Sequence, residues 1–246
     1  MEILKIENLT KNFGGLTAVN NLTIRIYQNE ILGLIGPNGS GKTTVFNLVT
    51  GFYRPNTGTI FFKGGEITHL KPYQICQRGL TRTFQLVKPF INLNVFKNVR
   101  GGTYHREHAN NARTKLTLEI LQFVNLESKR DFLARDLTLP ELKRLELARA
   151  LATQPDLLLL DEVMAGLTPT ETEAFMGMIR SLRQKGLTIF LIEHVMRAVV
   201  GLCDRVVVIN YGEKIAEGVP SEVVRDRNVI EAYIGEESTG VGSIPS

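Results

Sequence analysis

The beginning of the chain alternates short apolar runs with polar turns, as β-strands do. Residues 4–9 place apolar side chains on an early extended stretch, and residues 22–26 alternate apolar and polar positions. Residues 31–35 are apolar apart from one glycine, which is typical of a strand buried in a parallel sheet. We therefore predict that residues 1–35 form strands.

The apolar positions change to helical spacing directly after this region. Val45, Leu48 and Val49 fall on one face of a helix, and Gly51 is a suitable point for that helix to stop. A turn then leads into residues 59–62, which we interpret as a further strand.

Three later apolar runs have the length and composition of buried strands: residues 157–160, 188–192 and 205–210. A helix over roughly residues 170–185 separates the first two. It has Thr168 as its N-cap, Pro169 at its first position and Glu171 three residues after the cap. Strands that alternate with helices indicate a mainly parallel sheet with helical crossovers, so the predicted fold class is α/β.

From residue 86 to about 150 the apolar pattern is helical. Leu116 and Ile120, for example, recur at helical spacing, and we predict a helical subdomain inserted into the α/β domain. No internal repeat indicates a second copy of the domain. Residues 1–236 are expected to form one domain, followed by a small, polar and flexible tail over residues 237–246.

The composition is that of an ordinary globular protein. The 246 residues are 43% hydrophobic and carry a net charge of +4, and no run of Lys and Arg predicts a nucleic-acid-binding surface. Cys76 and Cys203 lack metal-ligand spacing, which favours a reduced, cytoplasmic chain. We expect neither a signal peptide nor a membrane helix, because no apolar run reaches roughly 18 residues. Membrane attachment would then require a partner.

Residues 36–43 match the phosphate-binding pattern G-x-x-x-x-G-K-[ST] in full, after a strand and at the start of a helix. The residues expected to bind a nucleotide here are Gly36, Pro37, Asn38, Gly39, Ser40, Gly41, Lys42, Thr43 and Thr44. The glycines let backbone N–H groups point at phosphate oxygens. Lys42 can reach the β- and γ-phosphates, and the Thr43 hydroxyl can bind Mg²⁺. The alternative is a glycine-rich turn with chance residues.

A second motif adds two carboxylates. Four leucines at residues 157–160 are followed by Asp161 and Glu162. A carboxylate at the end of a strand beside the phosphate loop suits Mg²⁺ binding, and Glu162 can accept a proton from an attacking water. The alternative is that the pair is only a polar strand exit. Together the two motifs predict an NTPase or a kinase.

Three further residues stand where ATP-binding-cassette (ABC) ATPases carry functional groups. Phe13 lies in T-K-N-F-G, Gln85 ends T-R-T-F-Q, and His194 comes just after the strand that ends at Ile192. With the two motifs above, in this order, the chain resembles an ABC ATPase over nearly its whole length. Taken alone, the three residues would be a core phenylalanine, a surface glutamine and a structural histidine.

The resemblance implies a fold and a mechanism. ABC ATPases combine a P-loop NTPase core with an antiparallel β subdomain and a helical subdomain, and two of them enclose two ATP molecules. Phe13 would stack on adenine, and Gln85 would begin the helical subdomain. The implied catalytic residues are Lys42, Gln85, Glu162 and His194. The implied Mg²⁺-binding residues are Thr43, Gln85 and Asp161.

One motif departs from the family pattern. Residues 137–141 read L-T-L-P-E where ABC ATPases have the signature L-S-G-G-Q, so Leu139 and Pro140 replace both glycines. Thr168 also replaces the usual Asp of the following D-loop. These changes affect the part of the site that the chain lends to a partner and leave its own half intact. They favour a heterodimer with a second ATPase subunit, with a homodimer as the alternative.

Finer features resemble the branched-chain amino acid importers, and in particular the larger of their two ATPase subunits. These features are residues 81–85, 192–196 and 229–236. The lipopolysaccharide-export ATPase has a similar ending and stays an alternative. A non-transport ABC ATPase acting on DNA or ribosomes is disfavoured by the single P-loop and by the absence of heptads after it. A P-loop kinase would leave Gln85 and His194 unexplained.

The implied partners are transmembrane permease subunits, a second ATPase subunit and, indirectly, a periplasmic or extracellular substrate-binding protein. No nucleic acid is expected. The chain would be cytoplasmic and held at the inner face of the cell membrane by its permease.

Overall fold

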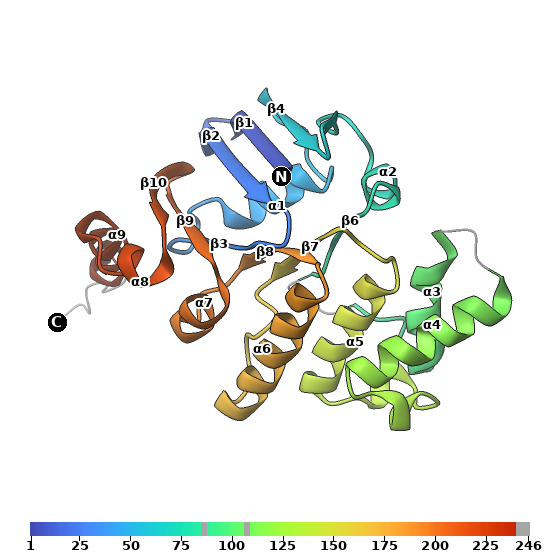
Figure 1. The fold of residues 1–246 in the computed structure, drawn as a ribbon. Coiled ribbons are helices and arrows are strands. Elements are labelled where there is room, and N and C mark those ends of the chain that lie inside the picture. The colour runs from blue at the N-terminus through green and yellow to red at the C-terminus, as the bar shows by residue number, and fades with distance from the viewer. Residues whose placement is uncertain (85–87, 106–108, 240–246) are drawn as a thin grey trace.

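Two β-sheets and the helices around them make up the structure, a computed structural model that describes residues 1–84, 88–105 and 109–239 (Figure 1). Within these ranges the larger sheet has six strands in the order β10-β9-β3-β8-β7-β6. They are β3 (Ile31–Ile35), β6 (Leu80–Arg82), β7 (Leu157–Asp161), β8 (Thr188–Ile192), β9 (Arg205–Asn210) and β10 (Glu213–Gly218). The neighbouring pairs are parallel except that β10 runs antiparallel to β9. The predicted mainly parallel core is confirmed.

The smaller sheet is antiparallel, in the order β2-β1-β4-β5. Its strands are β1 (Glu2–Phe13), β2 (Leu16–Tyr27), β4 (Thr57–Phe62) and β5 (Gly65–Glu66). The helix α1 (Lys42–Val49) packs against both sheets, since its Phe46 shares a buried core with Ile6 of β1 and Leu34 of β3. The phosphate-binding segment is therefore fixed between two layers.

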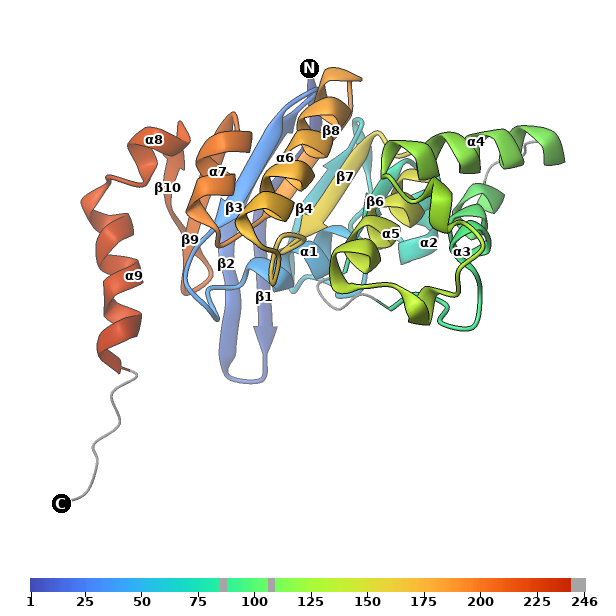
Figure 2. The same ribbon diagram turned by 90° about the horizontal axis from the view of Figure 1, so that it is seen from below.

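The remaining helices of the described residues surround the two sheets. They are α2 (Pro72–Gln77), α3 (Val95–Gly102), α4 (Asn110–Phe123), α5 (Leu139–Leu151), α6 (Pro169–Gln184), α7 (Met196–Leu202), α8 (Pro220–Val223) and α9 (Arg227–Thr239), with short 3₁₀ turns at Thr103–His105, Glu127–Lys129 and Ala134–Asp136. The helices α3, α4 and α5 gather at one end of the molecule, and α9 lies at the other (Figures 1 and 2).

Strand β3 is buried on both faces, as its apolar sequence predicts. Ile31 and Ile35 join the core beneath α5, α6 and α7, whereas Leu32 and Leu34 join the core around α1. Because side chains alternate along a strand, one five-residue segment contributes to both cores. The ends of this strand are thereby fixed, including the point where the phosphate-binding loop begins.

The predicted start of α6 is confirmed. Thr168 caps the helix by accepting a hydrogen bond from the Glu171 N–H at 3.3 Å, and Pro169 occupies the first turn. The sequence analysis missed β6 and β10. Strand β6 is only three residues long, and β10 is a largely polar edge strand, so neither carries the apolar alternation on which the prediction depends.

Helix α9 continues through Thr239, past the expected domain end at residue 236, and the last seven residues of the expected tail lie outside the described part of the chain. Among the described residues, no helix combines the length and the hydrophobicity that crossing a membrane requires.

Candidate nucleotide site

The phosphate-binding loop connects β3 to α1 and depends on two glycines. Gly36 has φ +150°, and a Cβ there would lie 2.0 Å from the Ile209 carbonyl oxygen of β9. Gly41 has φ +106°, and a Cβ there would lie 2.3 Å from the Ala18 oxygen of β2. Only glycine fits such close backbone approaches, so the loop is held against both neighbouring strands.

The loop ends where α1 begins, and no side chain caps that helix. The first N–H groups of a helix have no intrahelical acceptor and carry partial positive charge, which suits a phosphate group. The buried Lys42 ammonium lies in the same loop and donates hydrogen bonds to the carbonyl oxygens of Gly36 and Pro37, both at 2.7 Å. These contacts hold the ammonium group at the loop. Phosphate oxygens of a bound nucleotide would replace the two carbonyl oxygens as its acceptors, or would share the ammonium group with them.

A cavity of about 420 Å³ opens over this loop. Its lining residues are Phe13, Leu16, Thr17, Ala18, Asn38, Gly39, Ser40, Gly41, Lys42, Thr43, Thr44, Glu162 and Tyr211. Phe13, at the end of β1, is 42% exposed, and its ring meets Tyr53 edge to face at 5.2 Å. The cavity therefore joins an aromatic end to a cationic, N–H-rich end, as a nucleoside triphosphate requires.

Lys42→Ala is expected to lower nucleotide affinity by about 10- to 100-fold, because it removes hydrogen bonds from a charged donor to the phosphates in the bound ground state. Calorimetric titration with ATP measures the change. Lys115→Ala, at an exposed position on α4, is the matched control and should bind ATP as the unmodified chain does. Equal affinities for the two variants would contradict the assignment of Lys42.

The two carboxylates of the second motif end β7 and separate at once. Glu162 has φ +47°, and its N–H donates to the Ile192 carbonyl oxygen of β8 at 2.9 Å. This contact brings the ends of β7 and β8 together, so that Glu162 Oε1 lies 4.0 Å from His194 Nδ1. His194 is largely exposed, and Glu162 lines the nucleotide cavity. A base and a histidine predicted from separate strands therefore stand side by side.

Asp161 points the other way and is fully buried. Its Oδ2 forms an ion pair with Arg82 and accepts a hydrogen bond from Arg82 Nη2 at 2.6 Å, whereas its Oδ1 has no hydrogen-bond partner among the described residues. Burial raises the pKa of Asp161, and the Arg82 guanidinium opposes that rise. A buried carboxylate oxygen without a partner is a suitable ligand for a cation.

The residues present fit a Mg²⁺ ion. Asp161 and Thr43 line a second cavity of about 420 Å³ with Arg82 and Glu146, and Thr43 lines the nucleotide cavity as well. Mg²⁺ in nucleotide sites usually has one or two carboxylates, a hydroxyl, waters and substrate phosphates as ligands. The Thr43 hydroxyl and the Oδ1 of Asp161 are such ligands. Gln85, the third predicted metal contact and a predicted catalytic residue, lies outside the described residues.

Arg82 is a functional candidate that the sequence analysis missed. It leaves β6, donates to Asn47 Oδ1 at 2.5 Å, and its guanidinium lies 5.1 Å from the centre of the Phe84 ring. The sequence analysis used this arginine only as part of a motif that resembles a subfamily. A buried partner 79 positions along the chain gives no local signal.

Arg82→Met is expected to lower the free energy of unfolding of the nucleotide-free chain by about 3–5 kcal/mol, because the change leaves Asp161 buried without its ion pair. Urea unfolding at neutral pH is the measurement. Arg180→Met breaks the exposed pair with Glu173 and should cost no more than about 1 kcal/mol. A midpoint for Arg82→Met equal to that of Arg180→Met would contradict this account.

The altered signature begins α5. Thr138 and Glu141 form a capping box, in which the Thr138 N–H donates to Glu141 Oε2 at 3.0 Å. Leu139 is 46% exposed and packs against Gly166, where an added Cβ would meet it at 3.2 Å. Further along α5, Lys143 Nζ donates to the Glu162 carbonyl oxygen at 3.3 Å. The helix therefore contacts the segment of its own chain that contains Glu162.

The fold and the site are those of a P-loop nucleoside triphosphatase: a loop suited to phosphates, a buried carboxylate suited to a metal, and a second carboxylate beside a histidine. Comparison with known proteins gives the family. Residues 19–165 match the model of the ABC transporter family, and residues 213–239 match that of the branched-chain amino acid ATP-binding cassette transporters.

Individual relatives of the chain belong to the same family as these models. The chain is 38% identical to the high-affinity branched-chain amino acid transport ATP-binding protein LivG of Escherichia coli, over 95% of this chain and 98% of LivG. It is 34% identical to the lipopolysaccharide export system ATP-binding protein LptB of Haemophilus influenzae, over 96% and 99% of the two chains. A crystal structure of a nucleotide-free ATP-binding cassette from an ABC transporter superposes with a TM-score of 0.88 at 31% identity, covering 96% of this chain and all of the other.

This chain belongs to the ABC transporter ATP-binding family, and it is an ATPase. The predicted fold class and enzyme class are confirmed. The roles of single site residues stay predictions, although the described ones now have positions that suit them.

Proposed function

We propose that this chain hydrolyses Mg·ATP to power the import of branched-chain amino acids. The observation that carries the proposal is the match of residues 213–239 to the branched-chain amino acid family model. This region contains the whole of β10, α8 and α9, and it lies beyond the general ABC match. The similarity to LivG supports the same substrate class.

Within the site, each residue has one task. Lys42 and the N–H groups at the start of α1 hold the β- and γ-phosphates, and Phe13 stacks on the base. Thr43, Asp161 and Gln85 would hold a Mg²⁺ ion, which would supply positive charge to the β- and γ-phosphates. Glu162 accepts a proton from the attacking water, and His194 donates a hydrogen bond to the γ-phosphate. Positioning and charge stabilisation therefore account for most of the catalysis.

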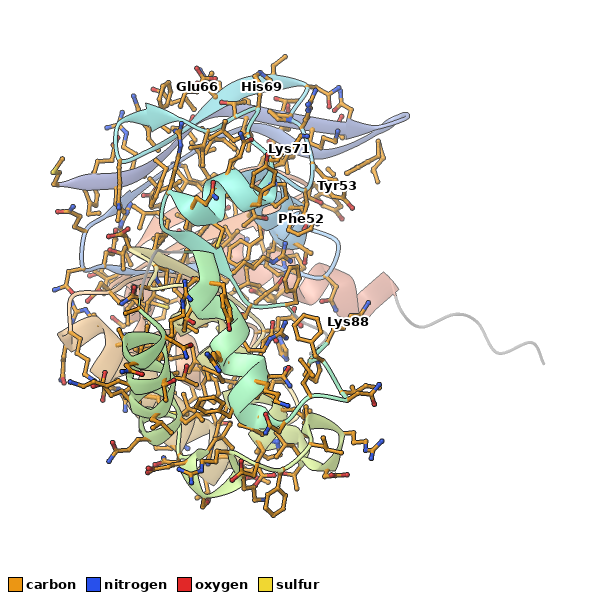
Figure 3. All side chains as sticks on the ribbon, turned by 90° about the vertical axis from the view of Figure 1, so that its right-hand side faces the viewer. Phe52, Tyr53, Glu66, His69, Lys71 and Lys88 are labelled. Atoms are coloured by element: carbon orange, nitrogen blue, oxygen red, sulfur yellow. The ribbon has the colours of Figure 1, made fainter. Side chains whose placement is uncertain are left out.

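The chain is proposed to work as part of a membrane complex. A second ATPase subunit would complete each ATP site, and two permease subunits would bind near the start of the helical subdomain. Figure 3 shows Phe52, Tyr53 and Lys88 on the face between the antiparallel sheet and that subdomain. Phe52 and Phe84 are exposed and touch edge to face at 5.7 Å. Exposed aromatic pairs of this kind are typical of protein interfaces.

In this arrangement the chain lies at the cytoplasmic face of the membrane through its permease, and an external binding protein delivers the substrate. Phe84 belongs to this face and directly precedes Gln85 in the sequence, so Gln85 would link the permease to the γ-phosphate site.

The experiment is reconstitution of the full complex in lipid vesicles, with its permease subunits, companion ATPase and binding protein. We expect ATP-dependent uptake of radiolabelled leucine, isoleucine or valine, and ATP hydrolysis that the loaded binding protein stimulates. A complex that carries Glu162→Gln in this chain is the control. Stimulation by lipopolysaccharide, without amino acid uptake, would instead assign the chain to an export system like that of LptB.

A further inference from the structure

One aromatic residue at the nucleotide cavity is of a type that its own turn does not favour. Tyr211 and Gly212 form the two-residue turn between β9 and β10, where Asn210 pairs with Glu213. Both have positive φ, +46° and +81°, as a type I′ turn requires. Such turns favour Asn or Asp followed by Gly, because a bulky side chain is strained at positive φ.

The side chain of Tyr211 gains little from packing in return. It is 86% exposed, the largest exposure among the described aromatic residues. Packing of the ring therefore does not offset the backbone strain, and strained residues tend to cluster at ligand sites. Its neighbours offer an explanation, because Tyr211 lines the same cavity as Phe13, Leu16 and the phosphate-binding loop.

The turn is also fixed relative to that loop. The Gly212 N–H donates to the Ser40 carbonyl oxygen at 3.0 Å, and the Gly212 oxygen accepts from the Asn20 N–H at 2.9 Å. A Cβ at Gly212 would lie 2.9 Å from the Ala18 oxygen. Tyr211 is thus held at a constant position relative to the phosphate-binding loop and to the end of β2, next to the cavity's apolar end.

We propose that Tyr211 is a second aromatic contact for the nucleobase or ribose of the bound nucleotide, in addition to Phe13. The proposal rests on the proposed nucleotide site. A ligand with its phosphates on the loop directs its nucleoside toward Phe13, Leu16 and Tyr211, where both of its flat faces can meet apolar surface. Stacking tolerates any base, so Tyr211 distinguishes a nucleotide from a bare polyphosphate and does not distinguish one base from another.

The test compares ADP with inorganic pyrophosphate, each with Mg²⁺, by calorimetry. Tyr211→Ala should weaken ADP binding about tenfold and leave pyrophosphate binding unchanged, whereas Tyr211→Phe should retain ADP affinity. Tyr73→Ala, an exposed tyrosine on α2, is the matched control and should change neither ligand. Unchanged ADP affinity in Tyr211→Ala, or equal losses for both ligands, would overturn the proposal.

Two further variants sharpen the test. Tyr211→Asn suits the turn, so it should raise the midpoint of thermal unfolding and weaken the binding of ADP. A higher midpoint with unaltered ADP affinity would contradict a ligand-binding role for Tyr211. The chain contains no tryptophan, so Tyr211→Trp supplies the single tryptophan of that variant. Binding of ADP should quench its fluorescence, and binding of pyrophosphate should not. If Lys42→Ala binds both ligands as tightly as the unmodified chain, the assignment of the nucleotide site is wrong. If Lys42→Ala weakens binding but the Tyr211 variants do not, the nucleotide site is correct and Tyr211 does not contact the nucleotide.

Discussion

Glu162→Gln is expected to lower the rate of ATP hydrolysis by about 10²- to 10⁴-fold while Mg·ATP affinity stays within about threefold of the unmodified chain. The amide keeps the shape of the side chain and cannot accept the proton of the attacking water. Glu162 lines the nucleotide cavity and lies 4.0 Å from His194. It directly follows β7, and its N–H is held by the Ile192 carbonyl at the end of β8. A loss confined to turnover is the result expected of a group that acts on water and not on the nucleotide.

Steady-state phosphate release and calorimetry measure the two quantities. Glu173→Gln, an exposed carboxylate on α6, is the matched control and should hydrolyse ATP normally. The proposed companion ATPase would contribute an ATP site of its own, so the assay is best made on the complex, with the site of each ATPase subunit altered in turn. Turnover within a few-fold of the unmodified complex would remove Glu162 from the role of base.

The elements that could be predicted from sequence are those whose signals are local. The phosphate-binding loop carries its own glycines, and the start of α6 carries its own cap in Thr168 and Glu171. Strands β3, β7 and β8 are short apolar runs because the fold buries both faces. In each case the residues that fix the structure lie within a few positions of each other.

The features that could not be predicted join distant segments. Arg82 on β6 meets Asp161 on β7 only because the strands pair in parallel, after the whole helical subdomain has intervened. Tyr211 reaches the cavity because the Gly212 N–H bonds to Ser40. Tertiary contacts of this kind leave no periodicity in the chain. The sequence motifs therefore predict the candidate catalytic groups, and the structure adds residues such as Arg82 that contact them.

The altered signature leads to the second prediction: the chain alone hydrolyses ATP slowly, and a companion ATPase with an intact signature raises turnover on the order of 10²-fold. In ABC dimers the signature of one subunit faces the γ-phosphate held by the other. Donors aimed at charge that develops in a transition state are each worth about 10²–10³ in rate. Pro140 has no N–H to donate, and Leu139 adds a side chain where close approach is needed.

The structure shows what the altered signature does in its own chain. The Thr138 N–H is already bonded to Glu141 Oε2. Burial favours a higher pKa for Glu141, but hydrogen bonds from Lys129 and Thr138 outweigh it and lower that pKa, so the carboxylate stays ionised. The Glu141 carboxylate is held by the Lys129 ammonium and by the Thr138 N–H at the start of α5. The capping box therefore stabilises α5 with the groups that a working signature would present to ATP.

The measurement is ATP hydrolysis by the purified chain, with and without its companion and permease, beside the double variant Leu139→Gly/Pro140→Gly. We expect the double variant to hydrolyse ATP faster than the unmodified chain when no companion is present, because it restores the backbone approach. Two glycines in the first turn weaken the helix by about 1 kcal/mol each, so Pro72→Gly at the start of α2 is the control for helix starts in general. Brisk turnover by the isolated chain, equal in the double variant, would show that its signature is competent. The case for a heterodimer would then lose its basis, because a half-site that already works needs no companion to complete it.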